Sequence, residues 1–216
     1  MMMKNTLATE APAIPEAVKM VVSQMDPGLP MPDMVSYYVL ENDRKIYLDR
    51  EIDEHVLNIQ RMILRWNMED AGKPAEERKP IRLYIFSPGG DVDVMWSIVD
   101  TIEASETPVY TIDVGVAASA AGLIFLAGHK RYMLSRSKVV IHEGSAHMAG
   151  DAVKVMDAGE SYKKMLRQMK DYILSRTQIN ASVLNKQKCH DWELDARYCL
   201  DHGVCDAIVG KLSEIL

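Results

Sequence analysis

Apolar residues along the chain switch between short runs and helical spacing, and this switching predicts the order of the elements. Short apolar runs are typical of buried strands, and they cover residues 36–40, 45–48, 81–86, 108–114, 131–134, 138–141 and 204–209. Between several of these runs, apolar residues recur every three or four positions, which is the period of an amphipathic helix. Strands that alternate with helices indicate an α/β fold with a largely parallel sheet.

The helical pattern is clearest in the first half of the chain and in one long later segment. The first helix has its apolar face at Ile52, Val56, Ile59, Ile63 and Trp66. A second helix follows Asp91, which can cap it, and a third begins at Ser119. Residues 153–178 read as one long helix, and residues 195–203 as a short one. Because the long helix is large for such a domain, we expect it to project or to pack against another subunit.

Two turns of small residues lie where predicted strands end and predicted helices begin. Residues 87–90 read Ser-Pro-Gly-Gly, and residues 115–122 read Gly-Val-Ala-Ala-Ser-Ala-Ala-Gly around Ser119. Ligand sites of parallel α/β sheets form at such junctions. So little side-chain bulk suits a place where another group approaches the backbone closely. We therefore interpret Ser119 as a candidate nucleophile at a strand-to-helix turn, where free helix N–H groups face an incoming carbonyl.

Composition and charge narrow the class of protein. The chain has 216 residues, 48% of them hydrophobic, and a formal net charge of −6, so it can bury a core. No cluster of Lys and Arg indicates a nucleic-acid or membrane-surface partner, and no apolar run reaches the roughly 20 residues of a membrane span. Residues 1–35, rich in Met and Pro, are predicted to be a flexible arm, and residues 36–216 one domain.

The cysteines favour a reducing, cytoplasmic location. Cys189, Cys199 and Cys205 are odd in number and form no C-x-x-C pair, which argues against a disulfide framework. His190 and His202 lie nearby, but the spacing fits no standard zinc pattern. We prefer to interpret these cysteines as small buried side chains.

A serine becomes a useful nucleophile only with a base, a group that orients the base, and donors for the oxyanion. His142 closes the apolar strand 138–141, and Asp191 precedes an aromatic residue and a predicted helix. The turn at residues 87–90 offers backbone N–H groups without an obstructing Cβ. Each feature also has an ordinary explanation when taken alone: a core histidine, a helix cap, a tight turn and a small packing serine.

Taken together, these residues resemble the proteolytic subunit of the Clp protease, a family of serine peptidases with a crotonase-like fold. The resemblance rests on the Ser-Pro-Gly-Gly turn, the Gly-x-Ala-Ala-Ser-x-x-Gly segment, Val-x-Ile-His, and a late Asp before Gly-Val-x-Asp. The order and the intervals both match, over about residues 36–212.

The resemblance implies a role for each residue. Ser119 would attack the scissile carbonyl, His142 would take and return the proton, and Asp191 would orient His142. The backbone N–H groups of Gly90 and Ala120 would bind the oxyanion. No metal or organic cofactor is implied.

The resemblance also implies an assembly. A crotonase-like α/β domain would carry a protruding helical handle at about residues 143–180, and a strand at residues 144–152 would pair with substrate. Homo-oligomeric heptameric rings would stack through the handles into a tetradecamer. Hexameric AAA+ unfoldases would feed unfolded polypeptide into the enclosed chamber.

The chain departs from the family pattern next to two of the candidate residues. Glu143 follows the histidine where the family has Gln-Pro, and His190 precedes the aspartate where the family has Arg. These changes affect the substrate pocket and the contact between rings, and the N-terminal arm does not match the family's axial loops. Two alternatives therefore stay open: a non-catalytic ring subunit that modulates an active paralogue, and a crotonase-like acyl-CoA enzyme. Ser119 stands where the latter needs an acidic base, which counts against it.

Overall fold

The computed structural model describes residues 40–144, 148–187 and 190–216. The chain divides into two compact units, and the described part of the first is residues 40–46. Residues 40–42 form a helical turn, closed by hydrogen bonds from the Asp43 N–H to the Leu40 oxygen (3.0 Å) and from the Arg44 N–H to the Glu41 oxygen (2.8 Å). The predicted strand at residues 36–40 is therefore wrong at Leu40, because its carbonyl closes a turn. Residues 36–39 and the predicted arm lie outside the described residues.

The second unit, Tyr47–Leu216, is built on a mainly parallel sheet in the order β1-β2-β3-β4-β7. Its strands are β1 (Lys45–Leu48, of which the last two residues belong to this unit), β2 (Ile81–Ser87), β3 (Val109–Ala118), β4 (Lys130–Leu134) and β7 (Ala207–Val209). Strand β5 (Lys138–Ile141) pairs in parallel with the far end of β3 and antiparallel with β6 (Trp192–Asp195). The predicted α/β class is confirmed.

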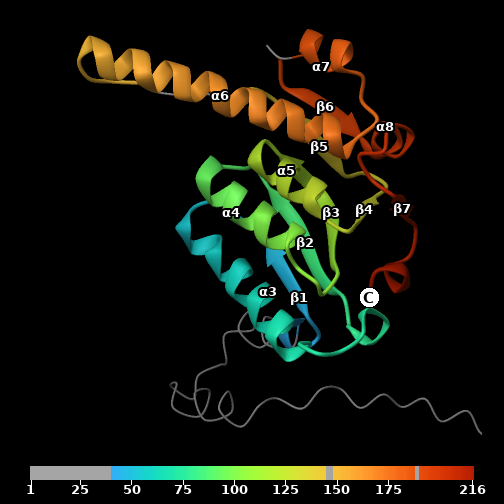
Figure 1. Ribbon diagram of the computed structural model, residues 1–216. Coiled ribbons are helices and arrows are strands. Elements are labelled where there is room, and N and C mark those ends of the chain that lie inside the picture. Colours follow the sequence, from blue (N-terminus) through green and yellow to red (C-terminus); the bar gives the residue numbers. More distant parts are fainter. Residues whose placement is uncertain (1–39, 145–147, 188–189) are drawn as a thin grey trace, which may run out of the picture. The chain divides into compact units, whose positions relative to one another are not determined.

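Helices α3 (Leu57–Glu69), α4 (Val92–Glu103) and α5 (Ala120–Ala127) lie side by side against the sheet (Figure 1). Helix α6 (Ala152–Arg176) packs its last turns beside α5 and projects beyond the sheet, as predicted for a handle (Figure 1). The remaining helical elements are α7 (Ala181–Gln187), α8 (Ala196–Asp201) and the short 3₁₀ turns η1 (Glu54–Val56), η2 (Ala75–Glu77) and η3 (Leu212–Glu214).

Several local predictions are confirmed, and others need correction. The Asp91 carboxylate caps α4 by accepting a hydrogen bond from the Val94 N–H (2.9 Å). Strand β3 runs on to Ala118 rather than ending at Val114, because it pairs with both β4 and β5. Helix α7 and strand β6 were not predicted. The predicted strand at residues 144–152 is wrong in its described part, because α6 already begins at Ala152 and residues 148–151 form no strand; residues 145–147 lie outside the described part.

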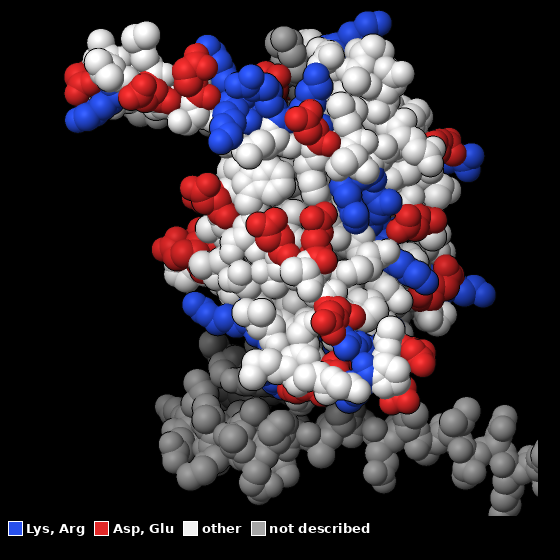
Figure 2. Space-filling model, viewed as in Figure 1, with Lys and Arg blue, Asp and Glu red and all other residues white. Residues whose placement is uncertain are grey.

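The core lies between the sheet and its helices. All eight residues of α5 are buried, and they pack between β3 and the neighbouring helices. Among the described residues, no helix combines the length and apolar character that crossing a bilayer requires. On the face shown in Figure 2, acidic and basic side chains are interspersed over the body and along the projecting helix, so neither sign dominates that face.

Candidate active site

The turn between β3 and α5 holds Ser119 in an unusual backbone conformation. Its φ of 54° and ψ of −125° lie in a region that residues with a side chain rarely adopt. Such strain costs about 1–3 kcal/mol and persists only where the surroundings enforce it. The Ser119 N–H donates to the Val140 oxygen (2.8 Å), and the Gly122 N–H donates to the Ser119 oxygen (3.0 Å). These bonds fix the turn and leave the serine side chain uncommitted to capping α5.

Close backbone packing explains the small residues around Ser119. A Cβ on Gly89 would lie 2.7 Å from both the Ala118 oxygen and the Ser119 Cβ. A Cβ on Gly122 would lie 3.2 Å from the Ala117 oxygen. The turn at residues 87–90 therefore rests directly on the turn that carries Ser119. The close approach that the sequence predicted is confirmed.

Gly90 sits where its N–H takes no part in the local pairing. A parallel bridge joins Ile52 to Gly90, but its hydrogen bonds run from the Ile52 N–H to the Gly89 oxygen and from the Asp91 N–H to the Ile52 oxygen, both 2.8 Å. A Cβ on Gly90, whose φ is 147°, would lie 2.3 Å from the Ile52 oxygen, so only glycine fits. The Ala120 N–H, in the first turn of α5, has no acceptor within its own helix.

The β5–β6 pairing brings His142 to Asp191. Ile141 is opposite Trp192 in this antiparallel register, so the residue after β5 meets the residue before β6. His142 Nδ1 lies 3.5 Å from Asp191 Oδ1, with the two side chains 34% and 80% exposed. Asp191 does not cap a helix, since Asp195 caps α8 through the Tyr198 N–H (2.7 Å).

Ser119 and His142 share one cavity. Ala118 is opposite Val140 in the β3–β5 register, which brings the ends of these strands together. Both side chains line a cavity of about 220 Å³. No hydrogen bond joins them within the described part of the chain, and hydrogen bonds between catalytic groups are often long in ligand-free structures.

The cavity walls are mainly apolar. Its apolar lining residues, besides the site itself, are Leu123, Ile141, Leu166, Met169, Ile173 and Leu184. Glu143, Arg167 and Lys170 add charges. The helical spacing of the α6 residues signalled an apolar face, but the contribution of α7 had no signal, because its helix was not predicted.

The described cysteines are structural. Cys199 and Cys205 are buried, as expected, and Cys189 lies outside the described residues. Burial raises the pKa of the Cys205 thiol to about 11 and raises that of Cys199 above its ordinary value, so neither is a ready thiolate. The His202 ring stacks on the Tyr198 ring at 3.8 Å, and its Nδ1 lies 3.0 Å from the Tyr198 oxygen.

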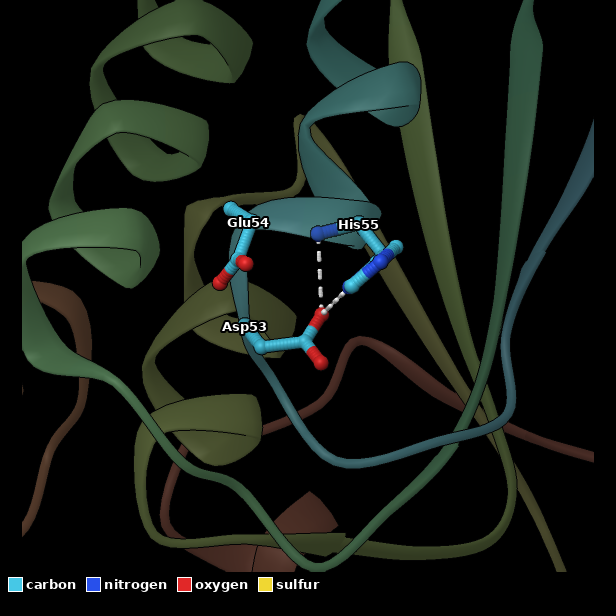
Figure 3. Close-up of side chains that lie close together, drawn as sticks. All are labelled: Asp53, Glu54 and His55. Carbon is cyan, nitrogen blue, oxygen red and sulfur yellow. Dashed lines mark hydrogen bonds and ion pairs between the residues drawn. The ribbon is translucent and has the colours of Figure 1, made fainter.

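One exposed group of potential metal ligands lies at η1. Asp53, Glu54 and His55 bring one ligand atom each within 4.8 Å of one another (Figure 3). The Asp53 carboxylate already accepts a hydrogen bond from the His55 N–H (2.9 Å) and lies 3.2 Å from His55 Nδ1. Because the three residues are consecutive and Asp53 caps the turn, we interpret the group as a helix cap.

Known proteins of one family resemble this chain over most of its length. The Clp protease family model matches residues 33–211. The ATP-dependent Clp protease proteolytic subunit 2 of Treponema pallidum (strain Nichols) is 34% identical over 139 residues, which are 63% of this chain and 70% of that protein. The subunit 2 of Rhodococcus jostii (strain RHA1) is 30% identical over 190 residues, 87% of this chain and 94% of that protein.

A third relative extends the similarity along nearly the whole chain. The ATP-dependent Clp protease proteolytic subunit of Porphyromonas gingivalis (strain ATCC BAA-308 / W83) is 30% identical over 204 residues, 93% of this chain and 85% of that protein. With its α/β fold and projecting helix, this chain belongs to the Clp protease family.

Proposed function

We propose that this chain is a serine endopeptidase subunit that hydrolyses peptide bonds of unfolded polypeptides. The proposal rests on the proximity of three side chains. Ser119 and His142 line one cavity, and His142 Nδ1 lies 3.5 Å from Asp191 Oδ1. Membership of the Clp protease family supports the same assignment.

In the proposed mechanism, Asp191 determines which nitrogen of His142 acts. A carboxylate beside Nδ1 favours the tautomer with its proton there, so the Nε2 lone pair accepts the Ser119 proton. The Ser119 oxygen then bonds to the scissile carbonyl carbon. His142 returns the proton to the leaving amine as the carbon–nitrogen bond breaks. Water, activated by the same imidazole, hydrolyses the acyl-enzyme and restores Ser119.

The oxyanion formed in each step would be held by the N–H groups of Gly90 and Ala120. Support comes from their surroundings: the Ile52 bridge makes no use of the Gly90 N–H, and the Ala120 N–H begins a helix. Preorganised donors of this kind typically contribute about 10²–10³ in rate each. The apolar cavity wall supports an apolar substrate side chain next to the cleaved bond.

The proposed assembly is a homo-oligomer of heptameric rings, stacked through α6 and served by an AAA+ unfoldase. Val153 and Met156 near the start of α6 are 68% and 72% exposed, which supports their burial against another subunit. The relatives named above are subunits of ATP-dependent proteases. A cytoplasmic location stays a prediction.

Labelling with a fluorophosphonate tests the proposal most directly. The native chain should form a covalent adduct and hydrolyse a short fluorogenic peptide. Ser119→Ala should abolish the adduct and lower hydrolysis by about 10⁴-fold or more, because the nucleophile is gone. Ser135→Ala, which alters an exposed serine in the turn after β4, is the matched control and should label normally.

Other outcomes distinguish the alternatives. A native chain that neither labels nor hydrolyses the peptide, yet forms rings, would be a non-catalytic ring subunit. Retention on immobilised coenzyme A would favour an acyl-CoA enzyme. Labelling that persists in Ser119→Ala would place the nucleophile elsewhere and contradict the proposal.

A further inference from the structure

Arg176, in the last turn of α6, reaches across to the C-terminal end of α5. Its Nε donates to the Leu126 oxygen (2.9 Å), and its Nη2 donates to the oxygens of Gly128 (3.0 Å) and Ala127 (3.4 Å). The last four carbonyl oxygens of a helix accept no hydrogen bond from an N–H of the same helix. One guanidinium therefore satisfies the end of α5 and places a positive charge where the helix dipole favours one.

Arg176 is itself held through both its backbone and its side chain. The Arg131 Nη1 donates to the Arg176 carbonyl oxygen (2.7 Å), and Arg131 also pairs with Asp206 (3.3 Å). Glu103 of α4 lies 4.0 Å from the Arg176 Nε and accepts a hydrogen bond from the Tyr172 hydroxyl (2.9 Å). The backbone of Arg176 is thus tied to β4, and its guanidinium lies beside α4.

Besides Arg176, the Thr111 hydroxyl of β3 donates to the Phe125 oxygen (2.7 Å) near the same end of α5. All eight of its residues are apolar or glycine, and all are buried, so its side chains contribute packing without direction. The axial position of α5 therefore depends on hydrogen bonds to backbone atoms at its two ends, and at the first end the Ser119 N–H donates to the Val140 oxygen (2.8 Å). At the other end, Arg176 supplies three hydrogen bonds and Thr111 one.

We propose that Arg176 is a positioning residue for the reaction. By fixing the C-terminal end of α5, it sets where the Ala120 N–H and the Ser119 oxygen stand relative to the scissile carbonyl. The inference rests on the proposed function, because it assigns Arg176 a role in that site. The guanidinium itself does not touch the substrate, so its effect is exerted through α5.

Substitution of Arg176 should change turnover more than substrate binding. Arg176→Met should lower kcat on a fluorogenic peptide about tenfold and leave KM within about twofold, because misplacement affects the reacting geometry. Arg176→Lys, which keeps the charge but loses the planar fork, should recover part of kcat. Arg65→Met is the matched control: it removes a surface guanidinium that pairs with Glu69 on α3 and should leave both constants unchanged.

Amide hydrogen exchange tests the same link without any activity. In Arg176→Met, amides of residues 120–128 should exchange at least about fivefold faster, while those of α3 keep their rates. Unchanged exchange in α5, an unchanged kcat, or a fall in kcat that Arg65→Met reproduces would overturn the positioning role. If the native chain neither labels nor hydrolyses, the proposed function fails, and the exchange rates alone then decide whether Arg176 holds α5.

Discussion

The segment from β3 through α5 and the outer half of α6 are opposite environments within one unit. Every residue of α5 is buried, and the residues of β3 are buried or half-buried. Of the 25 residues of α6, only Met169 and Ile173 are buried, and both lie near the sheet. The outer half of α6 instead exposes apolar side chains such as Val153 and Met156.

The difference shows where neighbours restrict the choice of residue. Around Ser119, backbone atoms approach one another so closely that even a methyl group has no room. Along outer α6, only the helix itself restricts the choice within a single chain. The same kind of substitution should therefore have large effects in one region and small or opposite effects in the other.

We expect the largest difference between the two regions in how a buried and an exposed carboxylate affect the pH dependence of stability. Asp113 on β3 is fully buried; its Oδ1 accepts from the Gly115 N–H (2.9 Å), and its Oδ2 has no hydrogen-bond partner among the described residues. Burial raises the pKa of Asp113 from 3.8 to about 7. Between these values the folded chain keeps a proton that the unfolded chain releases, so stability is lost as pH rises from about 4 to about 7.

Asp113→Asn should remove the loss of stability that the ionisation of Asp113 causes as pH rises. Relative to the variant, the native chain should lose on the order of 4 kcal/mol of unfolding free energy between pH 4 and pH 8. Urea unfolding at a series of pH values measures it. Glu160→Gln on α6 is the control: the hydrogen bond with Lys163 lowers the pKa of Glu160, but this carboxylate is fully exposed, so solvent screening should leave the pH dependence nearly unchanged. Parallel curves for the native chain and Asp113→Asn would contradict the prediction.

The next contrast uses one substitution, glycine to alanine, at the site. Gly89→Ala should lower the unfolding free energy by about 3 kcal/mol, because φ is +97° and the new Cβ meets the Ala118 oxygen and the Ser119 Cβ at 2.7 Å. Peptide hydrolysis should fall by about 10²-fold as the nucleophile is displaced. Chemical unfolding and steady-state kinetics measure the two effects; native values for both would mean that the turn can move aside.

The smallest effect has the opposite sign. Gly159→Ala in outer α6 should raise the unfolding free energy by about 0.5–1 kcal/mol, because nothing lies within 4 Å of the added Cβ and alanine favours the helix. Chemical unfolding of the chain measures it. A loss of stability instead would indicate that another subunit packs on this face of α6.

Sequence reasoning predicted the elements whose own residues determine them. The apolar run of β2, the Asp91 cap of α4 and the helical period of α6 are local signals, and each is confirmed. The small residues around Ser119 correctly indicated close backbone approach. The sequence also indicated Ser119, His142 and Asp191, whose proposed roles the labelling experiment tests.

The features that the sequence did not predict depend on contacts with residues far away along the chain. Strand β6 reads Trp-Glu-Leu-Asp, and only its leucine is buried, so it forms because β5 offers an edge. Leu40 looked like the end of a strand, but turn hydrogen bonds hold it in a helical conformation. The role of Arg176 has no local signal either, because its acceptors lie about fifty residues earlier in the chain.

The antiparallel pairing of β5 with β6 also sets an order of events during synthesis. These strands are neighbours in space, but α6 and α7 separate them along the chain. Closing so long a connection costs conformational entropy that only the finished pairing offsets. A nascent chain that has left the ribosome only as far as α7 still lacks the strand that brings Asp191 to His142, so the last part of the proposed triad is completed only after α6 and α7 have been made.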